Sequence, residues 1–228
     1  MNIGVIADGP TDRRILFKIV ECFIPCVNKI ELTRLKFRSA IDDYWSASNT
    51  NNFWFPNESA KNLSSDVLRI LLSAFKEFGS HVGGLTEDDI LIASTDSECY
   101  LANSDKYFDS WAFSLTKIFI SGVESFYHTM LRQGYEKENL PLIIPILLFP
   151  STDIIIAVAK GMTGYYEKEA RELKRMVYNT ENLNTLQDED LNERALKYIT
   201  SDSVNLIFKH IPESRPFINL LSAIARTG

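Results

Sequence analysis

Three short apolar runs, each followed by an aspartate, place the strongest constraint on how this chain can fold. The runs and their aspartates are residues 3–7 with Asp8, residues 89–93 with Asp96, and residues 142–149 with Asp153. Apolar runs of this length that end in turn residues are typical of buried β-strands. Because the carboxyl ends of parallel strands lie along one edge of a sheet, we expect the three aspartates to meet at that edge.

Helical patterns separate these runs, which predicts an α/β fold with helices on both faces of the sheet. Thr11 or Asp12 is expected to cap the first helix, and residues 30–37 alternate as a further strand does. Residues 42–64 are rich in Asn and Ser, which predicts an irregular insertion. We therefore predict an α/β core over residues 1–160 and a C-terminal helical extension over residues 161–228, packed on that core.

The overall charge excludes one class of function. The 228 residues carry a net charge of −6, whereas proteins that coat nucleic acid with a broad face usually carry a basic excess. A small acidic site that recruits a metal ion is compatible with this balance. The negative charge also predicts that a nucleic-acid substrate is delivered by a partner.

The chain also lacks the marks of a membrane or secreted protein. Its longest apolar stretch, residues 140–159, is interrupted by Pro145, Pro150 and Asp153, and the N-terminus has no basic segment before its first apolar run. The three cysteines do not have metal-ligand spacing. We expect a cytoplasmic protein without a membrane association.

The aspartates after the apolar runs carry the chemistry that the sequence suggests. Carboxylates that meet at one edge repel each other unless a cation neutralises them, and oxygen ligands of this kind suit Mg²⁺ or Mn²⁺. Asp12 and Glu98 are close in sequence to Asp8 and Asp96 and are further candidate ligands. An aspartate after a strand is also a common turn former or helix cap, so the pattern alone leaves that reading open.

Three segments resemble small standalone Toprim domain proteins of bacterial defence loci, in the Toprim and overcoming-lysogenization-defect-type nuclease superfamily. The opening IGVIADGPTDRRIL is similar to the first Toprim motif, residues 94–99 occupy the place of the family's Asp-x-Asp motif, and RPFINLLSAI is similar to the closing helix. The resemblance implies a Toprim-like Rossmannoid sheet and Mg²⁺- or Mn²⁺-dependent phosphodiester chemistry. It assigns Asp8, Asp96 and Asp153 as catalytic residues and as metal ligands, with Asp8 as general acid or base.

Two residues depart from the family pattern. Asp8 stands where the family has Glu, which would retract the carboxyl group by about 1.5 Å. Ser94 stands where the first Asp of Asp-x-Asp belongs, which removes a charged ligand; Glu98 is expected to compensate as a metal ligand. Arg13 and Arg14 follow the first motif and are candidates for phosphate contact, with ion pairing to a nearby aspartate as the other reading.

These expectations lead to a functional hypothesis and its alternatives. The chain is expected to be a metal-dependent nuclease, a phosphodiester hydrolase acting on DNA or RNA. The resemblance also implies a partner ATPase and a role in antiviral defence, and a homo-oligomer is compatible with it. One alternative is a catalytically weak Toprim-like interaction protein that docks a partner, which Ser94 favours. Another is a phosphohydrolase acting on a small phosphorylated molecule.

Overall fold

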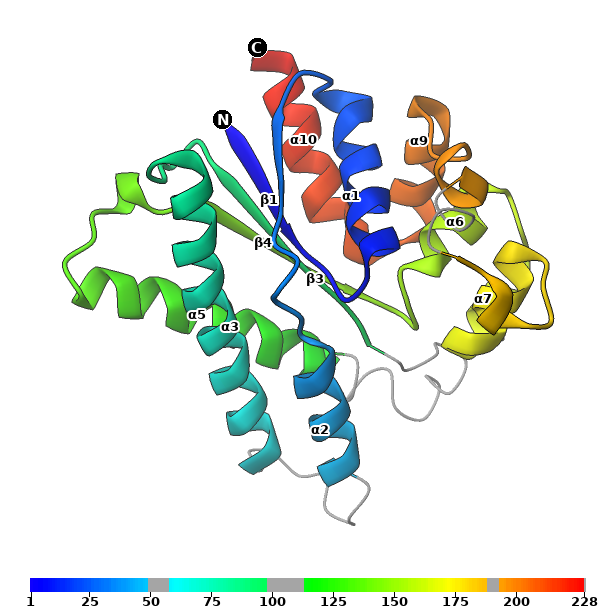
Figure 1. Cartoon of the computed structure of the whole chain (residues 1–228), viewed down its shortest axis with the longest axis horizontal. Helices are drawn as coiled ribbons and strands as arrows, with labels where there is room; N and C mark the ends of the chain where they lie inside the picture. The colour runs from blue at the N-terminus through cyan, green and yellow to red at the C-terminus, as the bar shows by residue number, and fades with distance from the viewer. Residues whose placement is uncertain (49–57, 98–112, 188–192, 228) are drawn as a thin grey trace. The chain divides into compact units, whose positions relative to one another are not determined.

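Four parallel strands form the sheet at the centre of the fold. The computed structural model describes residues 1–48, 58–97, 113–187 and 193–227 (Figure 1). The strands are β1 (Asn2–Ile6), β2 (Asn28–Glu31), β3 (Ile90–Asp96) and β4 (Leu142–Leu148), in the spatial order β2–β1–β3–β4. The predicted α/β fold, with flanking helices and a helical C-terminal region, is confirmed.

The positions of the strands follow from their side chains. β1 is central and buried, and it pairs in parallel with β2 and β3, so that Gly4 lies opposite Ile30 and Leu91. β4 is an edge strand, a position that accommodates Pro145, because proline donates no hydrogen bond to a neighbouring strand. The strand predicted at residues 30–37 is shorter and begins earlier, at Asn28–Glu31, and it is mostly exposed. The Leu32 amide still donates to the Val5 carbonyl of β1 at 3.0 Å, and the chain turns at residues 33–34.

The chain divides into two compact units, each built from several segments. In the described residues, the first unit contains 1–8, 28–48, 58–94 and 113–145, and the second contains 9–27, 95–97, 146–187 and 193–227. Asp8 therefore belongs to the first unit, whereas Asp12, Asp96 and Asp153 belong to the second.

The first unit is built from three helices and the strands that they accompany. They are α2 (Arg38–Ser48), α3 (Glu58–Val82) and α5 (Phe113–Arg132), with a short 3₁₀ helix at Lys137–Asn139. α3 packs along α5 and also contacts α2 (Figure 1). The two long helices approach closely at Gly122, where a Cβ atom would lie only 2.5 Å from Val67 Cγ1. Aromatic side chains contribute to the core of this unit. The ring centroids of Phe37 and Phe119 lie 4.9 Å apart in an edge-to-face arrangement.

The prediction of an irregular insertion at residues 42–64 is wrong for the residues of this range that the structure describes, because they are helical. α2 runs through residue 48 and α3 begins at Glu58, while residues 49–57 lie outside the described residues. Ile41 with Tyr44, and Leu63 with Val67, are spaced three or four apart and are buried. The polar residues between them interrupt the apolar pattern in the sequence, but they leave one buried face on each helix.

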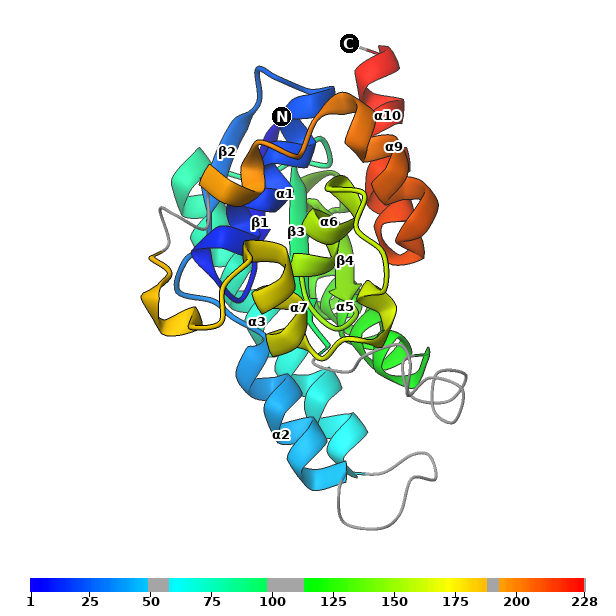
Figure 2. The ribbon, with the colours of Figure 1, turned by 90° about the vertical axis from the view of Figure 1, so that its right-hand side faces the viewer.

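The second unit holds the remaining helices, among them the C-terminal ones. They are α1 (Pro10–Phe23), α6 (Asp153–Ala159), α7 (Ala170–Tyr178), α9 (Ser201–His210) and α10 (Arg215–Thr227), with 3₁₀ helices at Tyr165–Glu167, Leu183–Thr185 and Pro212–Ser214. α6 packs against α7 and α9, and α1 contacts both α9 and α10 (Figure 2). Within the described ranges, every helix is too short or too polar to span a membrane.

Candidate functional site

Asp96, at the end of β3, is held by the turn that follows β4. Its Oδ1 accepts a hydrogen bond from the Thr152 amide at 2.7 Å and another from the Thr152 hydroxyl at 2.9 Å. Next to it, the Ser97 amide donates to the Leu148 carbonyl at 2.8 Å. These bonds fix the carboxyl end of β3 to the residue that immediately precedes α6. Thr152 thus stands at the N-cap position of α6, but its side chain bonds Asp96 instead of capping the helix.

Asp153 is the first residue of α6, and its carboxyl group lies in a poorly solvated environment. Burial raises the pKa of this carboxyl, and the Lys174 ammonium and the Tyr178 and Ser151 hydroxyls offset part of that rise. The Ser151 hydroxyl lies 3.5 Å from Asp153 Oδ2. Because Thr152 joins Asp96 to the start of α6, the structure brings Asp96 and Asp153 to one place in the second unit.

α7 supplies two side chains to this place, Lys174 and Tyr178, which are four residues apart and therefore lie on one face of the helix. The buried Tyr178 hydroxyl approaches the Asp153 carboxylate without completing a well-aligned hydrogen bond. Burial and the charge of Asp153 raise the pKa of the Tyr178 phenol far above its ordinary value, and Asp12 adds to this rise. The phenol is therefore neutral and keeps its proton.

The first turn of α1 brings further polar groups into the second unit. The N-cap of α1 is Gly9, so the prediction that Thr11 or Asp12 caps this helix is wrong; both lie inside its first turn. The preference of proline for the first helical position places the start at Pro10. The buried Thr11 hydroxyl has no hydrogen-bond partner among the described residues, and Asp12 acts electrostatically on Tyr178.

The other predicted site residues have different surroundings. Asp8, in the first unit, accepts a hydrogen bond on Oδ1 from the backbone amide of Arg38 at 3.0 Å, at the start of α2. Arg13 is buried and Arg14 is exposed, so only Arg14 presents its guanidinium to solvent. Ser94 is fully buried, and its hydroxyl has no partner in the described part of the chain. Glu98 lies outside the described residues.

The donor set limits how a divalent ion can be held. Among the described residues, no three His, Cys, Asp or Glu side chains gather into a group that could hold a metal ion. Mg²⁺ usually takes one or two protein carboxylates and completes its shell with water and substrate phosphate, so a group of three carboxylates is not required for it. Burial is the main cause of the raised pKa of Asp153, and Lys174 offsets only part of it.

Three residues of this site, Thr152, Lys174 and Tyr178, do not stand out in the sequence. The segment around Lys174 has charges four residues apart, the pattern of a solvated helix face. Tyr178 lies 25 positions beyond Asp153, and no local spacing links the two. Only the packing of α7 against α6 reveals that they meet.

Comparison with known proteins identifies no relative of this chain. No protein-family model, curated protein or solved structure matches this chain. The molecule is thus an α/β protein with a four-stranded parallel sheet, and its function has to be inferred from its own residues.

Proposed function

We propose that this protein is a metal-dependent nuclease of Toprim type, hydrolysing phosphodiester bonds in DNA or RNA. One observation carries the proposal: Thr152 bonds Asp96 directly and is followed in the chain by Asp153, so the residues that follow two neighbouring strands are joined at this point. The carboxyl edge of a parallel sheet is where α/β proteins place their sites. Toprim-like residues around Asp8 and Asp96 support the same chemistry.

The candidate site residues of the second unit have distinct roles in this proposal. Asp96 and Asp153 would hold Mg²⁺ or Mn²⁺, which when bound orients the phosphate and stabilises the leaving oxygen. The neutral Tyr178 hydroxyl keeps a proton at the Asp153 carboxylate, and Lys174 supplies positive charge beside it. Asp12 is a further acidic group near Tyr178.

Asp8 has the proton-transfer role in this proposal, as the Toprim resemblance implies. Its Oδ1 accepts a hydrogen bond from the Arg38 amide at the beginning of α2. A partner ATPase that delivers the nucleic acid, and a role in antiviral defence, belong to the same proposal. The net charge of −6 supports delivery by a partner, because it disfavours unassisted capture of a polyanion.

A catalytically weak interaction protein is the second candidate. Ser94 favours it, because it is buried and brings no charge to the position where Toprim proteins have an acidic ligand. A dose-dependent rise in melting temperature with Mn²⁺ would argue against it, because a ligand that binds only the folded state must stabilise that state.

Cleavage of plasmid DNA and single-stranded RNA in Mn²⁺ tests the proposal. The informative variant is Asp96→Asn, because asparagine keeps an oxygen that can accept both Thr152 bonds but has no charge to offer a metal ion. Asp202→Asn, at an exposed position in the first turn of α9, is the matched control. Cleavage by the wild type and the control, with at least a hundredfold loss in Asp96→Asn, is expected. Equal cleavage by all three proteins would overturn the proposal.

A further inference from the structure

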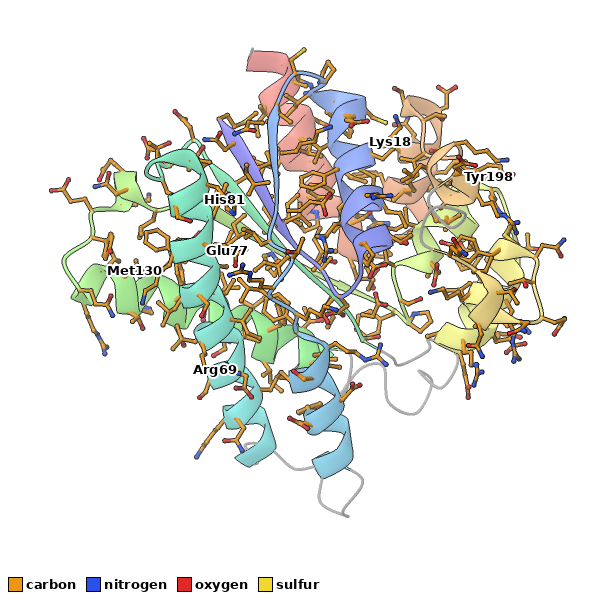
Figure 3. The ribbon with its side chains drawn as sticks, viewed as in Figure 1. Lys18, Arg69, Glu77, His81, Met130 and Tyr198 are labelled. Carbon is orange, nitrogen blue, oxygen red and sulfur yellow. The ribbon has the colours of Figure 1, made fainter. Side chains whose placement is uncertain are left out.

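Three cations of the second unit lie near one another in this acidic chain. Lys160 directly follows α6, and Arg194 and Lys197 lie in the segment between α7 and α9. We call these three residues the basic cluster. Tyr198, in the same segment, is labelled in Figure 3. None of the three cations was singled out by the sequence patterns.

The Tyr198 ring holds two of these cations together. Lys160 Nζ lies 4.7 Å from the ring centroid and Lys197 Nζ lies 5.2 Å from it. Both distances are within the range of a cation–π interaction, in which the negative face of the ring attracts the ammonium group. Lys160 Nζ also donates a hydrogen bond to the Val177 carbonyl in the last turn of α7, so its position is fixed.

Lys197 and Arg194 of the basic cluster act electrostatically on Lys160. Burial, followed by the charges of Lys197 and Arg194, lowers the pKa of Lys160, because neighbouring positive charges disfavour its charged form by repulsion. Within the ranges that the structure describes, no carboxylate forms an ion pair with any of the three. An anion bound there would remove this repulsion.

We propose that the basic cluster binds phosphate groups of a nucleic-acid strand. Arg194 and Lys197 are exposed and Lys160 is half-buried, an open arrangement that suits an extended polyanion better than an enclosed small molecule. The guanidinium fork of Arg194 matches two phosphate oxygens, and the two ammonium groups act as point charges. The identity of the strand as ligand rests on the proposed nuclease function.

Strand binding in EDTA tests this inference without requiring cleavage. The measurement is fluorescence anisotropy of labelled single-stranded DNA and RNA of about 20 nucleotides, in a salt series, with wild type and two double variants. Arg194→Gln/Lys197→Gln removes the two exposed members of the cluster. Arg132→Gln/Lys137→Gln removes an exposed arginine and an exposed lysine of the first unit, so both double variants lose the same charge. Because all four side chains are exposed, melting temperatures close to that of the wild type are expected.

The cluster variant is expected to bind at least about tenfold more weakly at low salt. Its slope of log Kd against log salt should be shallower by about 1.4, because two phosphate contacts are lost at about 0.7 each on single strands. The control variant should bind as the wild type does. The inference is overturned if the wild type binds neither strand, if the two double variants bind equally, or if inorganic phosphate competes as strongly as the strand at equal phosphate concentration.

The same protein preparations separate this inference from the proposed function. Binding that depends on the cluster, together with equal cleavage by the wild type and Asp96→Asn in Mn²⁺, would refute the proposed nuclease site and support the cluster as a binding surface. Cleavage that depends on Asp96, together with strand binding that is unchanged in Arg194→Gln/Lys197→Gln, would support the nuclease and refute the basic cluster as a binding surface.

Discussion

The Thr152 amide and the Thr152 hydroxyl both donate to the same oxygen of Asp96, at 2.7 and 2.9 Å. This pair of bonds joins the end of β3 to the start of α6, where Asp153 is the next residue. Thr152 is 2% exposed, so water does not replace the bonds easily. The relative position of the two aspartates therefore depends on a residue that carries no charge itself.

Thr152→Val tests whether the relative position of Asp96 and Asp153 depends on the Thr152 hydroxyl. The substitution keeps the backbone donor and removes the hydroxyl donor, and a hydrogen bond to a charged group contributes about 1.5–3 kcal/mol. We expect the free energy of unfolding in urea to fall by about 2 kcal/mol, and Mn²⁺-dependent cleavage to fall with it. Thr152→Ser retains the hydroxyl and should lose less than about 1 kcal/mol. A valine variant as stable as the wild type would show that the hydroxyl bond is dispensable.

The raised pKa of Asp153 predicts how stability depends on pH. The folded chain binds this proton more tightly than the unfolded chain, so stability falls as pH rises from the ordinary value of 3.8 through the raised pKa. Asp153→Asn cannot ionise and is expected to melt at a higher temperature than the wild type at about pH 7 in EDTA. The difference should disappear at pH values below the ordinary aspartate pKa.

Thermal melting across this pH range, with exposed Asp202→Asn as the control, checks the assignment to Asp153. The control should follow the wild-type curve. A lower melting temperature for Asp153→Asn at neutral pH would mean that the carboxylate is better compensated than its surroundings imply.

Gly122 is predicted to be essential for the packing of α3 against α5. A Cβ atom there would lie 2.5 Å from Val67 Cγ1, 2.6 Å from Val67 Cβ and 3.1 Å from the Ser64 carbonyl oxygen, so the helices must separate. Gly122→Ala is expected to lower the free energy of unfolding by about 3 kcal/mol, the upper range for overpacking. Gly79→Ala on α3 meets only ordinary contacts with Leu85 and should raise stability by up to about 1 kcal/mol. If both alanine variants gain stability, the close approach is not present in solution.

Asp89 forms a buried network that is separate from the candidate site. Its Oδ1 accepts from the Asn2 amide at 2.7 Å and the Asn2 side chain at 2.8 Å, and its Oδ2 accepts from the Thr86 amide at 3.0 Å. Asp89→Asn puts an NH₂ group against one of these donors, and a loss of about 2–3 kcal/mol is expected. Urea unfolding measures it, with exposed Asp88→Asn as the control; equal stability of the two variants would argue against the network.

Much of the sheet could be predicted because its central strands are local apolar runs. β3 and β4 were expected from residues 89–93 and 142–149. The error over residues 42–64 has a physical origin: α2 and α3 bury a narrow apolar face, and their polar residues resemble those of a loop. Helices of this kind form through tertiary packing more than through intrinsic propensity.

The candidate site was predictable only at the positions that follow strands. Asp96 and Asp153 were identified because turn positions after apolar runs are fixed by topology. Tyr178 and Lys174 were not, because their relation to Asp153 arises from the packing of α7 on α6. The prediction that Thr11 or Asp12 caps the first helix was wrong because α1 begins at Pro10, with Gly9 as its N-cap.

The central claim is that Asp96 and Asp153 belong to a metal site, and Mn²⁺ binding by isothermal titration calorimetry tests it most directly. Wild type, Asp96→Asn, Asp153→Asn and the control Asp202→Asn are titrated under identical conditions. We predict saturable binding by the wild type and the control, and at least a tenfold loss of affinity in each site variant. No binding by the wild type, or equal binding by all four proteins, would contradict the account.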